Sequence, residues 1–126
     1  MTRTRIAVLV GTAVMSMAMA PSPLETAFHN TIVSTYPDGR KAELWLERDG
    51  SYAAEGRRHD RSSGHWKLKG GKLCLKQSHP IPVPFTYCTA VHDGGVGTSW
   101  AGKAVSGEAI NIKVVKGRAG GGSRRG

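Results

Sequence analysis

Apolar residues recur at every second position along residues 41–47, at Ala42, Leu44 and Leu46. A period of two is typical of a β-strand that buries one face. Segments of the same kind, several of them rich in β-branched residues, follow at short intervals to the end of the chain. The pattern predicts seven or eight short strands, taken from residues 30–36, 41–47, 51–55, 65–68, 73–77, 85–91, 98–104 and 108–115.

The residues between these segments are those that turns and loops require. Asp49-Gly50 between two strands is a strong hairpin signal, and Lys69-Gly70-Gly71-Lys72 predicts a second tight hairpin. Residues 56–64 are polar, basic and bounded by glycines, which indicates an exposed loop. Residues 78–84 carry proline at every second position, which predicts an extended connection or edge because proline cannot donate to a strand ladder. We therefore expect an all-β, antiparallel up-and-down meander, closed as a small barrel or folded as a sandwich.

The first 20 residues have the layout of a secretory signal peptide. Arg3 and Arg5 precede a run of uncharged residues, and Ala18-Met19-Ala20 ends the run with small residues at the recognition positions. The run is shorter than the roughly 20 apolar residues of a membrane span. We expect cleavage after Ala20, a periplasmic or secreted protein, and no transmembrane span in the mature form. An uncleaved N-terminal anchor is the alternative.

Residues 21–116 are predicted to form a single β domain. Two prolines at its start favour an extended lead-in at residues 21–28. Residues 117–126 are rich in glycine and arginine and are expected to be a disordered tail. The net charge of +9 falls to +7 when the two leader arginines are removed, and three of the remaining charges belong to the tail. The folded part is therefore mildly basic, which biases it towards anionic partners.

The chain has two cysteines, Cys74 and Cys88, in segments that are predicted to be strands. In an oxidising compartment the expected state of such a pair is one intramolecular disulfide. If residues 73–77 and 85–91 lie antiparallel, the two cysteines can face each other, and the bridge ties together the ends of the proline-rich segment. Two free thiols or an intermolecular bridge are the alternatives.

Basic residues gather in one part of the sequence. The loop at residues 56–64 holds three arginines, and lysines follow on the next predicted strand, where alternate residues share a face. This arrangement indicates an anion-facing patch, although solvated lysines also line ordinary sheet faces. The candidate anion-binding residues are Arg57, Arg58, Arg61, Lys67 and Lys69.

Trp45 interrupts the polar side of its predicted strand, where it stands between Glu43 and Glu47. Aromatic residues belong by default to a core, but apolar groups on polar faces often serve binding. Small barrels can hold one ligand in their interior. Trp45 is therefore a candidate for lining a ligand cavity or an interface.

The remaining side chains do not form a pattern typical of catalysis or of metal binding. None of the five histidines is paired with another at metal-ligand spacing, and no Cys-x-x-Cys is present. No serine lies in a Gly-x-Ser-x-Gly elbow, and oxidised cysteines cannot act as nucleophiles. The tail is similar to nucleic-acid-binding segments in composition only. We therefore expect no enzyme activity, no metal and no cofactor, and nucleic acid is not an expected partner.

Three short motifs resemble those of known proteins. Asp49-Gly50-Ser51-Tyr52, Gly64-His65-Trp66 and Leu73-Cys74-Leu75, with Cys88 later, are similar to a pattern in small exported bacterial proteins of unknown function. That resemblance implies a β-meander and no activity. Gly64-x-Trp66-x-Leu68 before a cysteine also resembles the periplasmic inhibitors of secreted metalloproteases, which are small disulfide-bonded, lipocalin-like barrels. In those proteins the motif lies near the mature N-terminus and an N-terminal trunk blocks the protease; here the position and the trunk differ, so no inhibitory residue is carried over.

The sequence therefore predicts a non-enzymatic exported β-domain protein. It is expected to bind an anionic component of the cell envelope, or another protein, through its basic loop. The alternative is a periplasmic protease inhibitor. Such an inhibitor would act through an N-terminal arm at residues 21–28 or through the proline-rich loop at residues 80–84, which is stiffened beside a disulfide.

Overall fold

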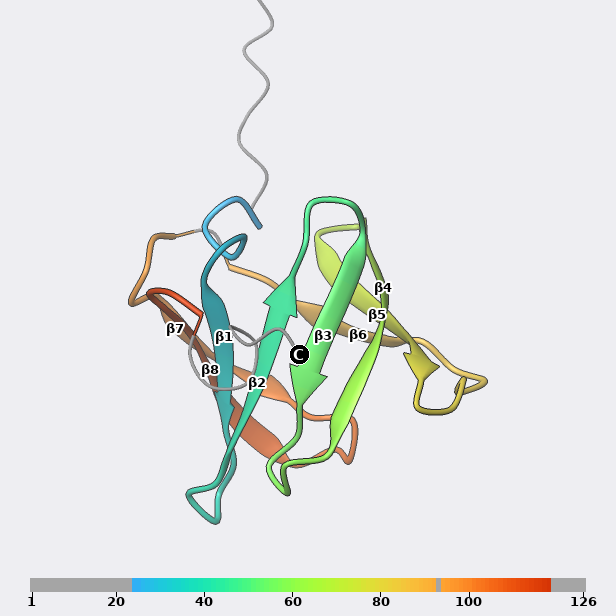
Figure 1. The fold of residues 1–126 in the computed structure, drawn as a ribbon. Helices are drawn as coiled ribbons and strands as arrows, with labels where there is room; N and C mark the ends of the chain where they lie inside the picture. The colour runs from blue at the N-terminus through green and yellow to red at the C-terminus, as the bar shows by residue number, and fades with distance from the viewer. Residues whose placement is uncertain (1–23, 93, 119–126) are drawn as a thin grey trace, which may run out of the picture.

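Eight antiparallel strands form one sheet in the computed structural model, which describes residues 24–92 and 94–118 (Figure 1). The strands are β1 (Thr31–Thr35), β2 (Lys41–Leu46), β3 (Ser51–Glu55), β4 (Arg61–Lys69), β5 (Lys72–His79), β6 (Tyr87–Ala90), β7 (Ser99–Lys103) and β8 (Ala109–Val115). Strands that follow each other in the sequence are paired except for β6 and β7, and β1 also pairs with β8. The expected all-β up-and-down meander is thus confirmed.

The sheet curls into a nearly closed barrel whose seam lies between β6 and β7 (Figure 1). These two strands contact each other without forming a ladder, and the Tyr87 hydroxyl donates a hydrogen bond to the Lys103 carbonyl across the seam. Because the described strands form one continuous sheet, the barrel form is present and the sandwich is not. Within residues 24–92 and 94–118, no helix is long and apolar enough to span a membrane.

The predicted disulfide between Cys74 and Cys88 is present. The two residues are register partners on β5 and β6, so the antiparallel arrangement expected for these segments is also confirmed. β6 has four residues and forms a ladder with β5 alone. The bridge therefore fastens the shortest strand of the sheet, which lies at the seam.

β4 begins at Arg61, so the exposed loop predicted for residues 56–64 is wrong in its second half. Only residues 56–60 connect β3 to β4. Gly64, which the sequence marks as the end of a loop, is a buried strand residue. A Cβ atom at this position would lie 2.0 Å from the carbonyl oxygen of Lys76 on β5. Glycine is required here because two backbones approach closely, and not because the chain turns.

The segment before β1 is a turn rather than the extended lead-in predicted for residues 21–28. The Phe28 amide donates to the Leu24 carbonyl (3.3 Å). Both of these side chains are buried, and the Phe28 ring centroid lies 5.7 Å from that of Trp66. The turn thereby closes one end of the barrel. Residues 1–23, which include the predicted signal peptide, lie outside the described residues.

The first residues after β8 are held against the neighbouring strands. The Gly117 amide donates to Asn30 Oδ1 (2.8 Å), and the Thr31 hydroxyl donates to the Gly117 carbonyl (2.7 Å). Arg118 forms an ion pair with Glu47, with Nη2 and Oε2 2.5 Å apart. The disordered tail predicted from residue 117 therefore does not begin at that residue. The rest of the predicted tail lies outside the described residues.

Candidate functional site

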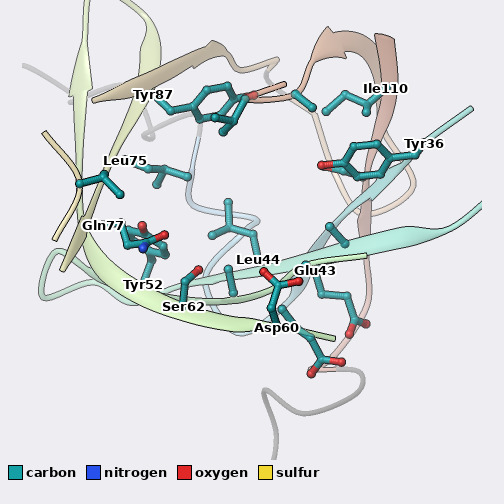
Figure 2. A pocket seen from close by; sticks show the side chains of 18 of the residues that line it. Tyr36, Glu43, Leu44, Tyr52, Asp60, Ser62, Leu75, Gln77, Tyr87 and Ile110 are labelled. Carbon is teal, nitrogen blue, oxygen red and sulfur yellow. The ribbon is translucent and has the colours of Figure 1, made fainter. Parts of the chain in front are cut away.

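The two ends of the barrel differ in how they are filled. The end that holds Leu24 and Phe28 is packed with buried apolar side chains. At the other end, where the β1–β2, β3–β4, β5–β6 and β7–β8 connections lie, the interior opens into a cavity of about 240 Å³ with a mostly apolar wall (Figure 2). Its wall includes Tyr36, Tyr52, Ala54, Leu75, Tyr87 and Ile110.

The cavity follows from a change in side-chain size along the inward faces of the strands. On β2 the inward residues run from Leu46 at the packed end to Ala42 at the open end, and on β4 they run from Trp66 to Ser62. Four residues of strand span about 13 Å, at ~3.3 Å per residue. The interior is therefore filled at one end and empty at the other. This trend could have been found in the sequence by comparing side-chain size at every second residue.

Several polar groups on the cavity wall are not used by the fold. Tyr52 is only 7% exposed and its hydroxyl has no hydrogen-bond partner among the described residues; burial raises its pKa. Tyr36 directs its hydroxyl across the cavity (Figure 2), and burial is the main cause of its raised pKa. Gln77, by contrast, donates through Nε2 to the Ile81 carbonyl (3.0 Å). Free hydroxyls in a largely apolar wall are the groups with which small-molecule sites orient a ligand.

Arg57 joins three of the connections around the cavity mouth. Its Nη2 and Nη1 atoms lie 2.6 and 3.3 Å from the two carboxylate oxygens of Glu108, between β7 and β8. Nη1 also lies 3.5 Å from Asp38 between β1 and β2, and the guanidinium stacks over the Tyr36 ring at 4.1 Å from its centroid. Hydrogen bonding from Arg57 holds the pKa of Glu108 below its usual value. Arg57 is therefore neutralised and holds the mouth together.

The other two arginines of the predicted basic loop lie near this mouth. Arg61 pairs with Glu55, with nitrogen and oxygen 3.2 Å apart. Arg58 is exposed in the β3–β4 connection. Two of the three predicted anion-binding arginines thus already have carboxylate partners, a pairing that the local sequence pattern did not indicate.

The predicted lysines lie elsewhere. Lys67 and Lys69 are on the outer face of β4, and Lys67 is about 20 Å along the strand from Arg61 at ~3.3 Å per residue. Lys72 on β5 is the register partner of Lys69. All three lysines are exposed, and none has an ion-pair partner in the described part of the chain. The structure therefore separates the five candidates: the three arginines lie near the mouth, and Lys67 and Lys69 lie apart from them. Together with Lys72, which was not among the candidates, these two lysines form a lysine face.

Trp45 is buried, with 1% of its surface exposed, although it lies on the side of β2 that the alternation marks as polar. Its Nε1 donates to Thr31 Oγ1 (3.0 Å), and the same hydroxyl holds Gly117. The chain after β8 thus runs beside the outward side of β2 at this point. Trp45 is not among the residues that line the cavity, and its indole presents no surface for a partner in this conformation.

Exposed apolar side chains surround the open end of the barrel. Phe85 in the β5–β6 connection and Val105 in the β7–β8 connection both line the cavity, and they are 51% and 64% exposed. Ile81, in the same connection as Phe85, is 68% exposed. The proline pattern marked the β5–β6 connection but not this apolar rim. Such groups at the entrance suit a ligand with an apolar part.

The two segments of the inhibitor hypothesis differ in the structure. The proline-rich loop at residues 80–84 is largely exposed. Within the N-terminal arm, Leu24 and Phe28 are buried in the end of the barrel, so this part of the arm is not free to enter a protease.

Comparisons of the chain with protein-family models, with curated proteins and with solved structures give no match. The resemblance to small exported proteins and to lipocalin-like inhibitors stays a prediction. In the part of the chain that the structure describes, no group of three or more His, Cys, Asp or Glu side chains could hold a metal ion. The fold and the cavity define a class: a small, disulfide-linked, eight-stranded barrel that is open at one end.

Proposed function

We propose that this protein is a non-enzymatic, exported binding protein that takes a small molecule into the open end of its barrel. The observation that carries the proposal is the cavity of about 240 Å³, with its apolar wall, free hydroxyls and apolar rim. An apolar cavity of roughly 150 Å³ is large enough to bind benzene. The space therefore suits a ligand with one ring or a short chain.

The proposed export is supported by two independent features. The disulfide is compatible with an oxidising compartment, where such bridges persist. The first 20 residues have the charge and length pattern of a signal peptide. An envelope or extracellular location would place the barrel where it can capture a molecule that passes through that space.

An NMR titration with a neutral one-ring probe, benzyl alcohol, tests the cavity directly. We expect saturable shifts of the amide signals of Ala54, Ser62 and Leu75 in the ¹⁵N-labelled protein, because these residues line the cavity. The Ala54→Leu variant places a larger side chain in the cavity and should abolish the saturable shifts. Ala53→Leu is the matched control, since Ala53 is exposed on the same strand. A wild-type protein that shows no saturable shift would refute the proposal.

A second candidate function keeps the predicted anionic partner but moves it to the lysine face. Three exposed lysines without ion-pair partners can neutralise an anionic polymer, and such binding weakens as salt is added. The test uses dextran sulfate at 20 and 300 mM salt. Replacing Lys67, Lys69 and Lys72 by glutamine should reduce the low-salt affinity for dextran sulfate more than three lysine-to-glutamine changes elsewhere on the barrel. Equal losses of affinity in the two variants would contradict a specific binding face. The control is the triple glutamine variant at Lys103, Lys113 and Lys116.

A further inference from the structure

Asp60 is the acidic residue that closes the β3–β4 connection, directly before β4. Its carboxylate lies over Gly56, where an added Cβ atom would be 2.6 Å from Oδ1. Figure 2 shows this side chain directed towards the interior, beside Ser62. Among the described residues the carboxylate has neither an ion pair nor a side-chain hydrogen bond, whereas the nearby Arg57 is held by other acids.

The charge of the cavity wall is opposite to that of the chain. The sequence carries a net charge of +9. Among the described residues the cavity is nevertheless bordered by three acidic residues, Glu43, Glu55 and Asp60, and by no lysine, arginine or histidine. Glu43 and Glu55 alternate with the inward residues Leu44 and Ala54, and Figure 2 shows the Glu43 side chain directed away from the interior. Glu43 and Glu55 are register partners on β2 and β3, and Glu55 already pairs with Arg61. Because Glu43 and Glu55 lie on the outward face of their strands, Asp60 is the acid that can meet a charge on a ligand in the cavity.

The remaining wall suits an aromatic ring. Tyr36, Tyr52 and Tyr87 come from three different strands or connections and line the same space with Leu75. Aromatic rings pack favourably against one another, and their faces attract cations. Tyr52 is nine-tenths buried and keeps an unpartnered hydroxyl on this wall, which indicates that a polar group of a ligand can be received there.

We infer that the cavity selects small aromatic amines, with the ring between the tyrosines and the protonated amine at Asp60. This inference rests on the proposed function, because it names the ligand class of the same site. Three observations carry it together: the unpaired carboxylate at the mouth, the absence of any basic residue from the described wall, and the tyrosine-lined interior. An anionic ligand of the same size is repelled by the negative charge of the Asp60 carboxylate and is rejected.

Three probes of matched size separate this inference from the proposed function. Benzylamine is positive at neutral pH, benzyl alcohol is neutral and benzoate is negative. We expect NMR titrations at low salt to give the tightest binding for benzylamine, by about fivefold over benzyl alcohol, which is the gain that a partly exposed ion pair supplies. Benzoate should bind most weakly. The advantage of benzylamine should shrink as salt is added.

The Asp60→Asn variant tests the assigned residue. It should remove the advantage of benzylamine over benzyl alcohol, and an amide spectrum that matches the wild type away from the cavity shows that the barrel is intact. Asp49→Asn is the matched control, because it makes the same charge change in the exposed β2–β3 turn at the packed end. The inference is overturned, and the proposed function stands, in either of two cases. In the first, the wild type binds benzyl alcohol as tightly as benzylamine. In the second, benzylamine still binds more tightly than benzyl alcohol in Asp60→Asn. If no probe binds the wild type, the proposed function itself fails.

Discussion

Removal of the disulfide should destabilise the seam of the barrel more than any other part. Cys74 and Cys88 are direct partners on β5 and β6, and β6 has no ladder on its other side. Without the bridge, four residues of β6 are held by one set of backbone hydrogen bonds and by the contacts across the seam. The perturbation is the double variant Cys74→Ala/Cys88→Ala, with the wild-type protein in reducing agent as its control.

The size of the effect follows from the loop that the bridge closes. The two cysteines are 14 positions apart, so the loop contains 15 residues. Chain entropy alone then gives about 3 kcal/mol of stabilisation. Cys74 is 5% exposed, and removal of its buried sulfur costs about 1 kcal/mol more. A total near 4 kcal/mol is a large part of the roughly 5–15 kcal/mol by which small domains are stable.

Urea unfolding measures the total loss, and amide hydrogen exchange locates it. We expect the free energy of unfolding to fall by about 4 kcal/mol, with the wild type in reducing agent losing about 3 kcal/mol. Exchange should accelerate first at the amides of β6, and benzyl alcohol binding should weaken because Tyr87 lines the cavity. A loss below about 1 kcal/mol with unchanged protection of β6 would refute the view that the bridge holds the seam.

Three further predictions concern single residues. Gly64→Ala should lower the free energy of unfolding by about 2 kcal/mol in urea, because its Cβ overlaps the Lys76 carbonyl; an unchanged midpoint would contradict the close approach. Trp45→Phe should cost about 1–2 kcal/mol and leave benzyl alcohol binding intact, since Trp45 is buried away from the cavity. Burial and Glu55 raise the pKa of Glu43, so stability should fall as pH rises from about 4.5 through that raised value. Glu43→Gln should remove this fall and gain less than about 1 kcal/mol at pH 7, and a loss there would contradict the sign.

The strands were predictable because the information that specifies them is local. Alternation along residues 41–47 and the Asp49-Gly50 turn fix where a strand lies and where it reverses, and the structure has β2 and β3 at those places. The disulfide pairing needed only the antiparallel neighbours that a meander provides. The start of β4 was missed because glycine and polar residues at its beginning are typical of loops. Gly64 is required by the approach of a second strand, and one segment read alone does not show that.

The site was less predictable because its interactions join distant parts of the chain. Arg57 meets Glu108, which is 51 positions away, and no local pattern reports that the pair neutralises the basic loop. Trp45 is buried because Thr31 and the residues after β8 come to its side of β2. The decrease in side-chain size towards the open end is different, since it is present along β2 and β4 in the sequence itself. This decrease predicts a cavity only when the strands are known to line the interior of one barrel.

The structure also limits how large a ligand can be. Tyr52 and Ile110 belong both to the packed core and to the cavity wall, so the floor of the cavity is made of side chains that stabilise the barrel. Enlarging the cavity would mean truncating such residues, and each truncation of a large buried side chain costs about 2–5 kcal/mol. A domain of this size has little stability to lose. A larger ligand can therefore extend only out of the cavity mouth, where it would contact the exposed Phe85 and Val105. The apolar rim, and not the floor of the cavity, therefore sets the length of the ligand.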